Sequence, residues 1–404
     1  MANSNQTFDL GVAGGGPAGL ATALLAARAG LDVALVAPKA QEDHRTFALM
    51  AGAVRMLQRI GVWERVASST APLRTLRIID DTGRLLRAPT VEFHADEIDL
   101  DAFAWNFPAG PLVRALEEAV ADEPRITRFE TNVSGVTPSE AGPILGLGDG
   151  TSVAARAIAA ADGRGSICRE AAGIAVDRWS YPQTALVTTI EHDRPHGFVS
   201  TEFHRRTGPY TLVPLPGQRS SVVLVETAKG AEDLMALDDD ALGAELSRRS
   251  HRLLGQVRIA GPRAAFPLSG LLPRSFAQNG IALIGEAAHV VPPIGAQGLN
   301  LGLRDAAMLA ECLTGAPDPA AALQDYDRRR RTDVVSRSAA IDLLNRSLLS
   351  DLVPAQAARS LGLFAMSRIE PLRQRMMREG VAPADATLPA IMRADDDTPS
   401  ARFA

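Results

Sequence analysis

The chain is poor in the residues that build disulfide frameworks, metal sites and membrane spans. It has only two cysteines, Cys168 and Cys312, which excludes a disulfide framework, a CxxC redox pair and a cysteine-rich zinc site. Its most apolar stretch, residues 19–36, is interrupted by Arg28 and Asp32 and suits a helix, a turn and a strand better than a membrane span. We therefore expect a protein without bound metal in a reducing compartment.

Lysine is also scarce, because Lys39 and Lys229 are the only two. The positive charge is almost entirely arginine spread along the chain, and the net charge is −5. Without a basic patch, the sequence argues against nucleic acid as a partner. Residues 1–8 are polar and lack a basic segment followed by an apolar one, so we expect no signal peptide. These features predict a cytoplasmic protein, and a peripheral position at the inner membrane stays open.

A chain of 404 residues, 46% of them hydrophobic, is long enough for two joined domains with a full core. The first clear pattern is a buried strand over 9–13, a glycine turn, an alanine- and leucine-rich helix and a second strand. This βαβ context gives a GxGxxG pattern its meaning. Gly14 permits the tight turn, Gly16 lets a pyrophosphate approach the backbone, and Gly19 lets the helix pack closely on the strand. The pattern predicts a dinucleotide-binding unit.

The identity of the dinucleotide is less clear from this segment alone. An acidic residue usually ends the second strand and binds the ribose, but here the strand runs into Val36-Ala-Pro-Lys39. Taken alone, this ending favours NADP, with Lys39 beside a 2′-phosphate. Glu42 or Asp43 is a possible replacement for the missing acid.

Strand patterns fill the middle of the chain and helix patterns the last part. Threonine- and valine-rich segments between residues 179 and 266 predict a sheet, and extended segments over 74–93 surround a hairpin turn near Asp81. Residues 319–351 and 354–380 read as two long helices. The predicted fold class is α/β with an α+β two-domain organisation.

Three segments far apart in the sequence match the pattern of one family. They are the glycine turn at 14–19, the segment Ala161-Asp-Gly-Arg-Gly-Ser-Ile-Cys-Arg169, and the long stretch from Gly285-Glu-Ala-Ala-His289 to Gly298-Leu-Asn-Leu-Gly302. Together they resemble the single-component FAD aromatic hydroxylases of the p-hydroxybenzoate hydroxylase class. Softer marks, such as residues 43–49 and 212–216, are most similar to the flavin hydroxylases of ubiquinone biosynthesis. Because all three segments match an FAD-binding family, we prefer FAD to NADP as the expected cofactor.

The resemblance implies a Rossmann-like FAD-binding domain, a β-sheet substrate domain and C-terminal helices. Both domains are expected to be discontinuous in sequence. The expected division is an FAD-binding domain over 1–73, 94–178 and 267–346, a substrate-binding sheet over 74–93 and 179–266, a C-terminal helix over 347–380 and a disordered tail over 381–404.

The resemblance also implies the chemistry. NAD(P)H reduces FAD, O2 adds to form a flavin C4a-hydroperoxide, and the hydroxyl passes to an aromatic ring, here that of a polyprenylated ubiquinone precursor. Such a substrate is compatible with peripheral membrane or biosynthetic-complex association. Three alternatives stay open: a hydroxylase of small soluble phenols anchored by Tyr210, Arg205 or Arg206, a flavin-dependent reductase of lipid double bonds, and a flavoprotein that serves mainly as a member of a complex.

Individual residues receive expected roles from the same likeness. Glu286 stands where most relatives carry aspartate and is expected to accept hydrogen bonds from ribityl hydroxyls, and Arg169 either contacts the cofactor or holds the Asp162 loop. Pro293 is expected to face the flavin and substrate, while His289 is expected to be a packed structural residue, so no acid or base is assigned. The expected cofactor-binding residues are Gly14, Gly16, Gly19, Arg45, Arg114, Asp162, Glu286, Gly298, Leu299 and Asn300. The expected lining of the substrate pocket is Leu212, Val213 and Leu215.

The last helix pattern, residues 355–377, carries an apolar face. We expect this face to pack on the core of the protein, with a membrane or a partner protein as the alternative.

Overall fold

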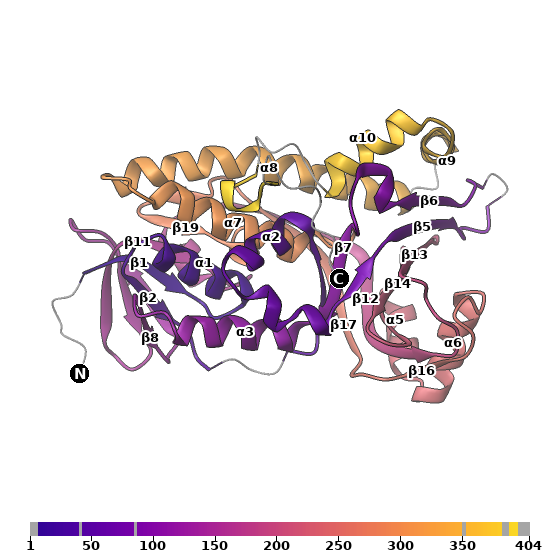
Figure 1. The fold of residues 1–404 in the computed structure, drawn as a ribbon, viewed down its shortest axis with the longest axis horizontal. Helices are drawn as coiled ribbons and strands as arrows, with labels where there is room; N and C mark the ends of the chain where they lie inside the picture. The colour runs from indigo at the N-terminus through magenta and orange to yellow at the C-terminus, as the bar shows by residue number, and fades with distance from the viewer. Residues whose placement is uncertain (1–6, 40–42, 85–86, 350–352, 382–387, 395–404) are drawn as a thin grey trace.

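The computed structural model describes residues 7–39, 43–84, 87–349, 353–381 and 388–394. Two large sheets lie side by side along the long axis of the molecule, and the long helix α8 runs above the first of them toward the second (Figure 1). Tyr181 of the second sheet donates a hydrogen bond of 2.6 Å to Asp342 of α8. Helix α8 therefore ties the two sheets together.

The first sheet is mostly parallel, with the order β18-β19-β11-β1-β2-β8. Strand β1 lies between β11 and β2 and is parallel to both. Its residues Leu10 and Val12 are fully buried on one face, and on the other face a Cβ on Gly11 would lie 2.9 Å from Leu145 of β10, so the strand is covered on both sides. The elements of this part are β1 (Thr7–Ala13), α1 (Pro17–Arg28), β2 (Val33–Val36), α2 (Ala51–Arg59), α3 (Ala109–Ala121), β8 (Ile126–Phe129), β9 (Val133–Thr137), β10 (Ile144–Leu147), β11 (Ser152–Ala160), α4 (Ile167–Ala171), β18 (Ala277–Gln278), β19 (Ile281–Leu283) and α7 (Gln297–Leu313).

The second sheet is mostly antiparallel, with the order β16-β12-β15-β14-β13-β5-β6 and β17 paired to β12. Helices α5 and α6 cover one face of it (Figure 1). On that face Tyr210, Leu212 and Leu224 join Leu242 and Leu246 of α6 in one buried cluster. The elements are β5 (Thr75–Asp80), β6 (Val91–His94), β12 (Val176–His192), β13 (Val199–His204), β14 (Pro209–Leu215), β15 (Arg219–Glu226), α5 (Ala228–Met235), α6 (Asp239–Arg249), β16 (Val257–Ile259) and β17 (Ala264–Pro273).

A third, small sheet joins the two large ones. It contains β3 (Thr46–Met50), β7 (Ala104–Pro108) and β4 (Ala71–Leu73), with β7 in the middle. Asn106 of β7 donates from Nδ2 to the carbonyl oxygen of Pro214 at 2.8 Å and to Ser221 Oγ at 3.1 Å. This buried amide fixes the small sheet against β14 and β15.

The predicted division into domains has three boundaries that fall inside strands, and the one at 93/94 lies within β6. The boundary at 178/179 lies within β12, and the boundary at 266/267 lies within β17. The two strands are paired along most of their length, so they run from one part of the molecule into the other as a continuous ribbon. The division itself stays a prediction.

The C-terminal part differs from the expectation in two ways. Instead of one helix over 347–380, the structure has the end of α8 (Pro319–Leu349), then α9 (Val353–Arg368) and α10 (Glu370–Val381). Pro371 lies in the first turn of α10, and because proline has no N–H and clashes with the preceding turn, α9 cannot continue through it.

The prediction of a disordered tail is wrong for residues 388–394. Leu388 and Met392 belong to the main hydrophobic cluster and are almost completely buried. Arg55 of α2 donates to the carbonyl oxygen of Met392 at 2.9 Å. These apolar contacts and this hydrogen bond hold the segment on α2; residues 382–387 and 395–404 lie outside the described ranges.

Candidate active site

Two helices begin side by side at glycine-rich turns. Helix α1 begins after Gly16 with Pro17 in its first turn, and α7 begins after Ala296, which has a left-handed backbone with φ 53°. Neither helix has a side chain that caps its N-terminal N–H groups. Gly302 of α7 has only 3.3 Å between an added Cβ and the Cβ of Ala18, so the two helices pack closely. Uncapped N–H groups at two adjacent helix starts attract anionic groups.

The glycines of the first turn divide into two kinds. A Cβ on Gly14 would lie 2.2 Å from the carbonyl oxygen of Ala161, and a Cβ on Gly19 would lie 2.1 Å from that of Gly14. The fold of the protein therefore requires glycine at these two positions, whether or not a ligand is bound. A Cβ on Gly16 or Gly298 would meet nothing within 4 Å, so these positions leave open space at the two helix starts. Open backbone beside unpaired N–H groups fits a dinucleotide phosphate and an isoalloxazine edge.

The loop after β11 is held by its own side chains. Asp162 accepts hydrogen bonds from Ser166 Oγ at 2.5 Å and from the backbone N–H of Cys168 at 3.1 Å. Arg169 is buried and donates to the carbonyl oxygens of Ala287 and Arg164, both at 2.8 Å. Both oxygens of Asp162 are engaged within the loop, so Asp162 shapes the site rather than offering a free carboxylate. Arg169 joins this loop to the one that follows β19.

Glu286 lies among arginines at the surface of the site. Its Oε2 accepts a hydrogen bond from Arg164 Nε at 2.9 Å, and its Oε1 lies 4.0 Å from a terminal nitrogen of Arg45. Arg45 also forms a two-pronged ion pair with Asp43, at 2.7 Å from NH2 to Oδ2. The hydrogen bonds that Arg45 donates to Asp43 raise the pKa of Arg45. Burial acts to raise the pKa of Asp43, but the same contacts outweigh it and lower that pKa.

Arg114 lies on the same side of the site as Arg45. It projects from α3 toward Gly110, where an added Cβ would lie 3.2 Å from its NH1 and 3.9 Å from the carbonyl oxygen of Asp43. Its side chain is exposed. Arg114 and Arg45 therefore approach the same segment, as expected of two cations that meet one anionic ligand. Glu42, the other suggested replacement for the missing acid, lies outside the described residues.

Asn300 connects the start of α7 to the small sheet. Its side chain is buried, accepts a hydrogen bond from the N–H of Met50 at 2.9 Å and donates to the carbonyl oxygens of Ala48 at 2.8 Å and Ala296 at 2.7 Å. Because every polar atom of this amide is used internally, Asn300 positions the α7 turn, and only its backbone is left to face a ligand. Pro293, Gly295 and Gly298 are exposed in the same loop.

His289 is held in a fully buried ion network. Its Nε2 lies 2.7 Å from Asp305 Oδ2, which also accepts the N–H of Gly285 at 2.9 Å. Arg330 donates from Nε to Asp305 Oδ1 at 2.7 Å and from NH1 to Asp333 at 2.6 Å. Burial acts to raise the pKa of Asp305, but the charges of His289 and Arg330 outweigh it and the pKa is lowered. The network locks α7 and α8 to the turn before Glu286.

The structure places the three residues expected to line the substrate pocket on two different faces of β14. Alternate residues of a strand point to opposite faces. Leu212 is buried in the cluster beneath α6, whereas Val213 packs against Ala48, Leu73 and Ala104 at the small sheet. Leu215 is two residues after Val213 and therefore points to the same face of the strand as Val213. Leu212 therefore belongs to the core of the second sheet and does not line the side that adjoins the α7 turn.

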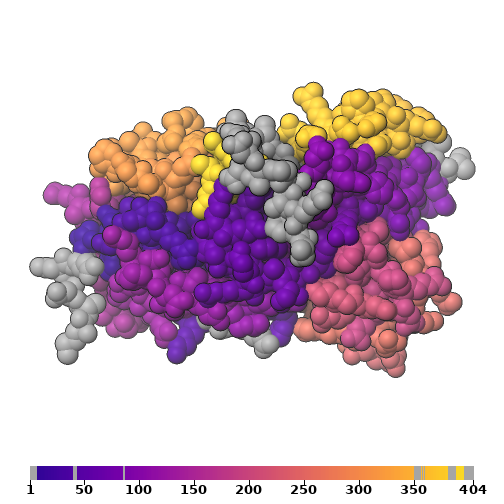
Figure 2. Space-filling view, viewed as in Figure 1, coloured from indigo at the N-terminus to yellow at the C-terminus, as the bar shows by residue number. Residues whose placement is uncertain are grey.

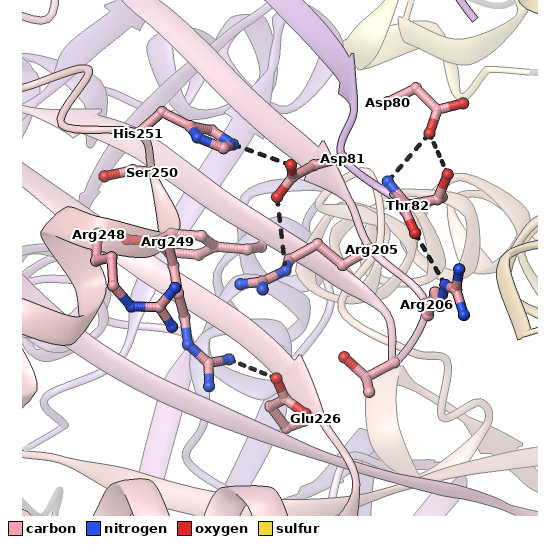
Figure 3. A network of polar contacts seen from close by, with 12 residues as sticks. Asp80, Asp81, Thr82, Arg205, Arg206, Glu226, Arg248, Arg249, Ser250 and His251 are labelled. Carbon is pink, nitrogen blue, oxygen red and sulfur yellow. Dashed lines mark hydrogen bonds and ion pairs between the residues drawn. The ribbon is translucent and has the colours of Figure 1, made fainter. Parts of the chain in front are cut away.

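The polar residues suggested for a soluble phenol also lie on the α6 side. Tyr210 is fully buried and donates to the carbonyl oxygen of Leu246 at 3.2 Å. Arg205 Nε lies 3.7 Å from Asp81, and Arg206 donates from Nε to the carbonyl oxygen of Thr82 at 2.9 Å. Figure 3 shows Arg205 beside Asp81, which also lies 2.9 Å from His251 Nε2, and Arg206 beside Thr82 in a separate group. These groups hold the β5–β6 connection in place.

Sequence reasoning missed two functional contacts of this site. Arg164 stands in the second motif, but no periodicity or spacing indicated that it would meet Glu286 more than a hundred residues away. Asp305 follows the third motif by three residues, and its position on α7 was the only available signal. Within the described ranges, no group of three or more histidine, cysteine, aspartate or glutamate side chains is arranged to hold a metal ion.

A dinucleotide cradle built from two helix starts, joined to a separate sheet with an apolar near face, defines a two-domain flavin-dependent oxidoreductase. The chain belongs to the FAD binding domain family, which matches residues 7–338. It is 32% identical to ubiquinone hydroxylase UbiL of Rhodospirillum rubrum over 94% of this chain and 90% of the relative. It is 28% identical to the 3-demethoxyubiquinol 3-hydroxylase of Escherichia coli over 93% and 98% of the two chains.

Solved structures share the fold along most of the chain. PqsL, a probable FAD-dependent monooxygenase from Pseudomonas aeruginosa, is 25% identical with a TM-score of 0.74 and covers 89% of this chain and all of its own. HpxO of Klebsiella pneumoniae, solved with FAD and uric acid, has a TM-score of 0.76 at 19% identity over 96% and 98% of the two chains. The protein is an FAD-dependent monooxygenase, and NAD(P)H and O2 are the co-substrates that fit its family.

Proposed function

We propose that this protein hydroxylates the aromatic ring of a polyprenylated ubiquinone precursor. The observation that carries the proposal is the pairing of an FAD cradle with an apolar sheet face in a chain 32% identical to a ubiquinone hydroxylase. Bound FAD supplies the oxygen chemistry, and the protein supplies binding, orientation and exclusion of water.

The cofactor roles follow from the geometry of the two helix starts. Gly16 and Gly298 give the pyrophosphate and the flavin edge access to backbone N–H groups, and Gly14 and Gly19 keep the turn tight enough to allow it. The side chains of Arg45 and Arg114 are placed to neutralise phosphate charge. Glu286 accepts hydrogen bonds from the ribityl hydroxyls, and Arg164 fixes the carboxylate through its hydrogen bond to Oε2. Leu299, partly buried against the core, seats the turn.

The substrate ring is proposed to lie between the α7 turn and the near face of β14. Val213 and Leu215 give this face its apolar character, and Pro293 borders it from the cofactor side. Asn300 and Asn106 support the arrangement, because they link the α7 turn through the small sheet to β14. No side chain is assigned as acid or base.

A small charged phenol is the weaker candidate. The polar groups that could anchor it, Tyr210, Arg205 and Arg206, are already engaged by Leu246, Asp81 and Thr82. A lipid-tailed precursor is dissolved in membranes, so the proposal includes peripheral association with the inner membrane or with other proteins of the pathway. No helix of the described ranges is long and apolar enough to cross a bilayer.

The test is complementation. The gene is expressed in bacterial strains that each lack one ring hydroxylase of ubiquinone synthesis, and quinone and accumulated precursors are quantified by mass spectrometry. Restored quinone in one strain supports the proposal and identifies the ring position. A Gly16→Ala variant is the matched control, because it leaves the fold intact and blocks the cradle. Stable, FAD-loaded protein that restores no strain would reject the ubiquinone substrate and leave a soluble phenol to be tested by stimulated NAD(P)H oxidation.

A further inference from the structure

Exposed hydrophobic side chains gather on the last two helices. The described residues include ten large hydrophobic side chains that are exposed; four of them lie on α9 and α10, and a fifth, Ile369, lies at the junction between the two helices. The expectation that this face packs on the core is therefore wrong for these positions. The exposed fractions are 68% for Leu361, 47% for Phe364, 50% for Ile369, 39% for Leu372 and 53% for Met376. We call these five residues and the two helices the α9–α10 ridge.

The ridge has a separate inward side that holds it to the protein. Leu363 of α9 and Met377 of α10 are buried in one cluster with Val91 and Phe93 of β6. Arg373 forms an ion pair with Glu97 at 2.5 Å. The exposed side chains are therefore not needed for docking of the helices. Figure 1 shows both helices above β5 and β6, and in Figure 2 they protrude at one end of the molecule.

The ridge is basic in an acidic protein. Residues 353–381 contain five arginines and two glutamates, although the whole chain has a net charge of −5. Arg368 and Arg375 have no ion pair among the described residues, and the guanidinium of Arg368 lies 5.7 Å from the centre of the Phe364 ring. Arginine beside exposed aromatic and aliphatic groups is the composition of helices that lie in the interface of an anionic membrane.

A cleft opens at the edge of the ridge. It has a volume of about 510 Å³ and lies between α9 and the β5–β6 connection. Its lining combines two arginines with apolar groups: Arg87, Ala88, Pro89, Phe364, Ser367 and Arg368. Arg87 has no ion pair among the described residues either. A cleft with two cationic groups and an aromatic wall suits a phosphate headgroup with the start of its acyl chains.

We propose that the α9–α10 ridge is the surface with which this protein docks on an anionic lipid bilayer. A second copy of the chain is disfavoured as the occupant, because a symmetric contact brings the same arginines of both copies together. Docking on a bilayer rests on the proposed function in one respect only, because that function supplies the reason for docking: access to a lipid-tailed substrate. Binding to lipid can be measured without that substrate.

The experiment is flotation of the FAD-loaded protein with vesicles that contain no quinone precursor. Vesicles of phosphatidylcholine alone are compared with vesicles of phosphatidylcholine and phosphatidylglycerol. We expect binding to the anionic vesicles about tenfold or more tighter than to the neutral ones. Two variants, Leu361→Ser with Phe364→Ser, and Arg368→Glu with Arg375→Glu, each reduce that binding about tenfold or more.

Matched controls distinguish binding through the ridge from non-specific binding of the protein to vesicles. Phe198→Ser removes another exposed phenylalanine, at 36% exposure, whose ring also lies beneath an arginine, Arg74 at 5.1 Å. Arg178→Glu reverses an exposed arginine elsewhere on the surface. Both controls should bind anionic vesicles as the wild type does. Since the ridge side chains are exposed, the variants should keep their FAD content and melting temperature.

Three results would overturn the proposal. One is the absence of binding to any vesicle, and another is binding that the ridge variants leave unchanged. The third is a change confined to oligomeric mass in light scattering, which would make a second copy the occupant. Because the vesicles carry no substrate, a failure of docking leaves the hydroxylase proposal standing, and a failure of complementation leaves the docking result intact.

Discussion

Arg164 and Glu286 bridge two loops that are far apart in the sequence, with Arg164 Nε donating to Glu286 Oε2 at 2.9 Å. Arg164 follows β11 and Glu286 follows β19, and these strands are parallel neighbours. Their carboxyl ends meet at one edge of the sheet, where ligands of open α/β sheets bind.

Removal of Arg164 should weaken FAD binding without harm to the fold. Because both side chains are about half exposed, the pair contributes only about 1 kcal/mol or less, so Arg164→Ala should lower FAD affinity about two- to fivefold. Arg125→Ala is the control, since Arg125 pairs with Asp32 at the same 2.9 Å and with similar exposure. Titration of each apoprotein with FAD, followed by fluorescence, measures the FAD affinity of both variants. Equal FAD affinity in the two variants would show that Arg164 does not position Glu286.

Two glycines of one turn should fail for different reasons. Gly16→Ala adds a Cβ in open space, so the apoprotein should melt within about 1 °C of the wild type, while FAD binding falls at least about tenfold, as expected for a blocked pyrophosphate. Gly19→Ala adds a Cβ 2.1 Å from a carbonyl oxygen and should destabilise the apoprotein by about 1–3 kcal/mol. Thermal unfolding and FAD titration separate the two effects. Unchanged FAD affinity in Gly16→Ala would contradict the assignment of the cradle.

Asp305 should make stability fall in acid. Its pKa is lowered in the folded protein, so its contribution is present above the unfolded value of about 4 and is lost as the pH falls through the folded value. Asp305→Asn leaves Arg330 and His289 without their buried partner and should cost about 3–5 kcal/mol at neutral pH.

The difference between wild type and Asp305→Asn should narrow below about pH 4, because the wild type then loses the same charge. Chemical denaturation of the apoproteins over this pH range measures it. Asp240→Asn, at an exposed position of α6, is the control and should follow the wild type. A constant difference at every pH would mean that the charge of Asp305 is not what stabilises the network.

Neighbouring residues of β14 should have opposite phenotypes. Leu212→Ala opens a cavity beneath α6 and should reduce the free energy of unfolding by about 2–5 kcal/mol, with little effect on the KM of the folded enzyme. Val213→Thr keeps the volume, changes stability by about 1 kcal/mol or less, and should raise the KM for an apolar aromatic substrate about three- to tenfold. Denaturation and substrate-stimulated NAD(P)H oxidation give the two readouts. A raised KM in Leu212→Ala alone would place the substrate on the other face.

The three motifs, the glycine turn among them, could be recognised in the sequence because their structural requirements are local. Gly14 and Gly19 must lack a Cβ because backbone oxygens of the turn itself and of the adjacent strand lie too close. A βαβ unit brings those atoms together in every protein that contains it. The class of cofactor and the two-domain fold followed from them. The exchange of aspartate for Glu286 was visible, but its partner was not.

Tertiary packing decided what the sequence left open, because it depends on which distant surfaces meet. The apolar stripe of residues 355–377 predicted one buried face, and the structure buries Leu363 while it exposes Phe364. The composition of the tail predicted disorder, yet Leu388 and Met392 find a place on α2. By itself, the sequence determined a dinucleotide-binding fold through local spacing, and FAD as the cofactor through its resemblance to one family. Only long-range contacts decided which face of β14 packs on the small sheet, the partner of Glu286 and which apolar side chains of α9 and α10 stay exposed.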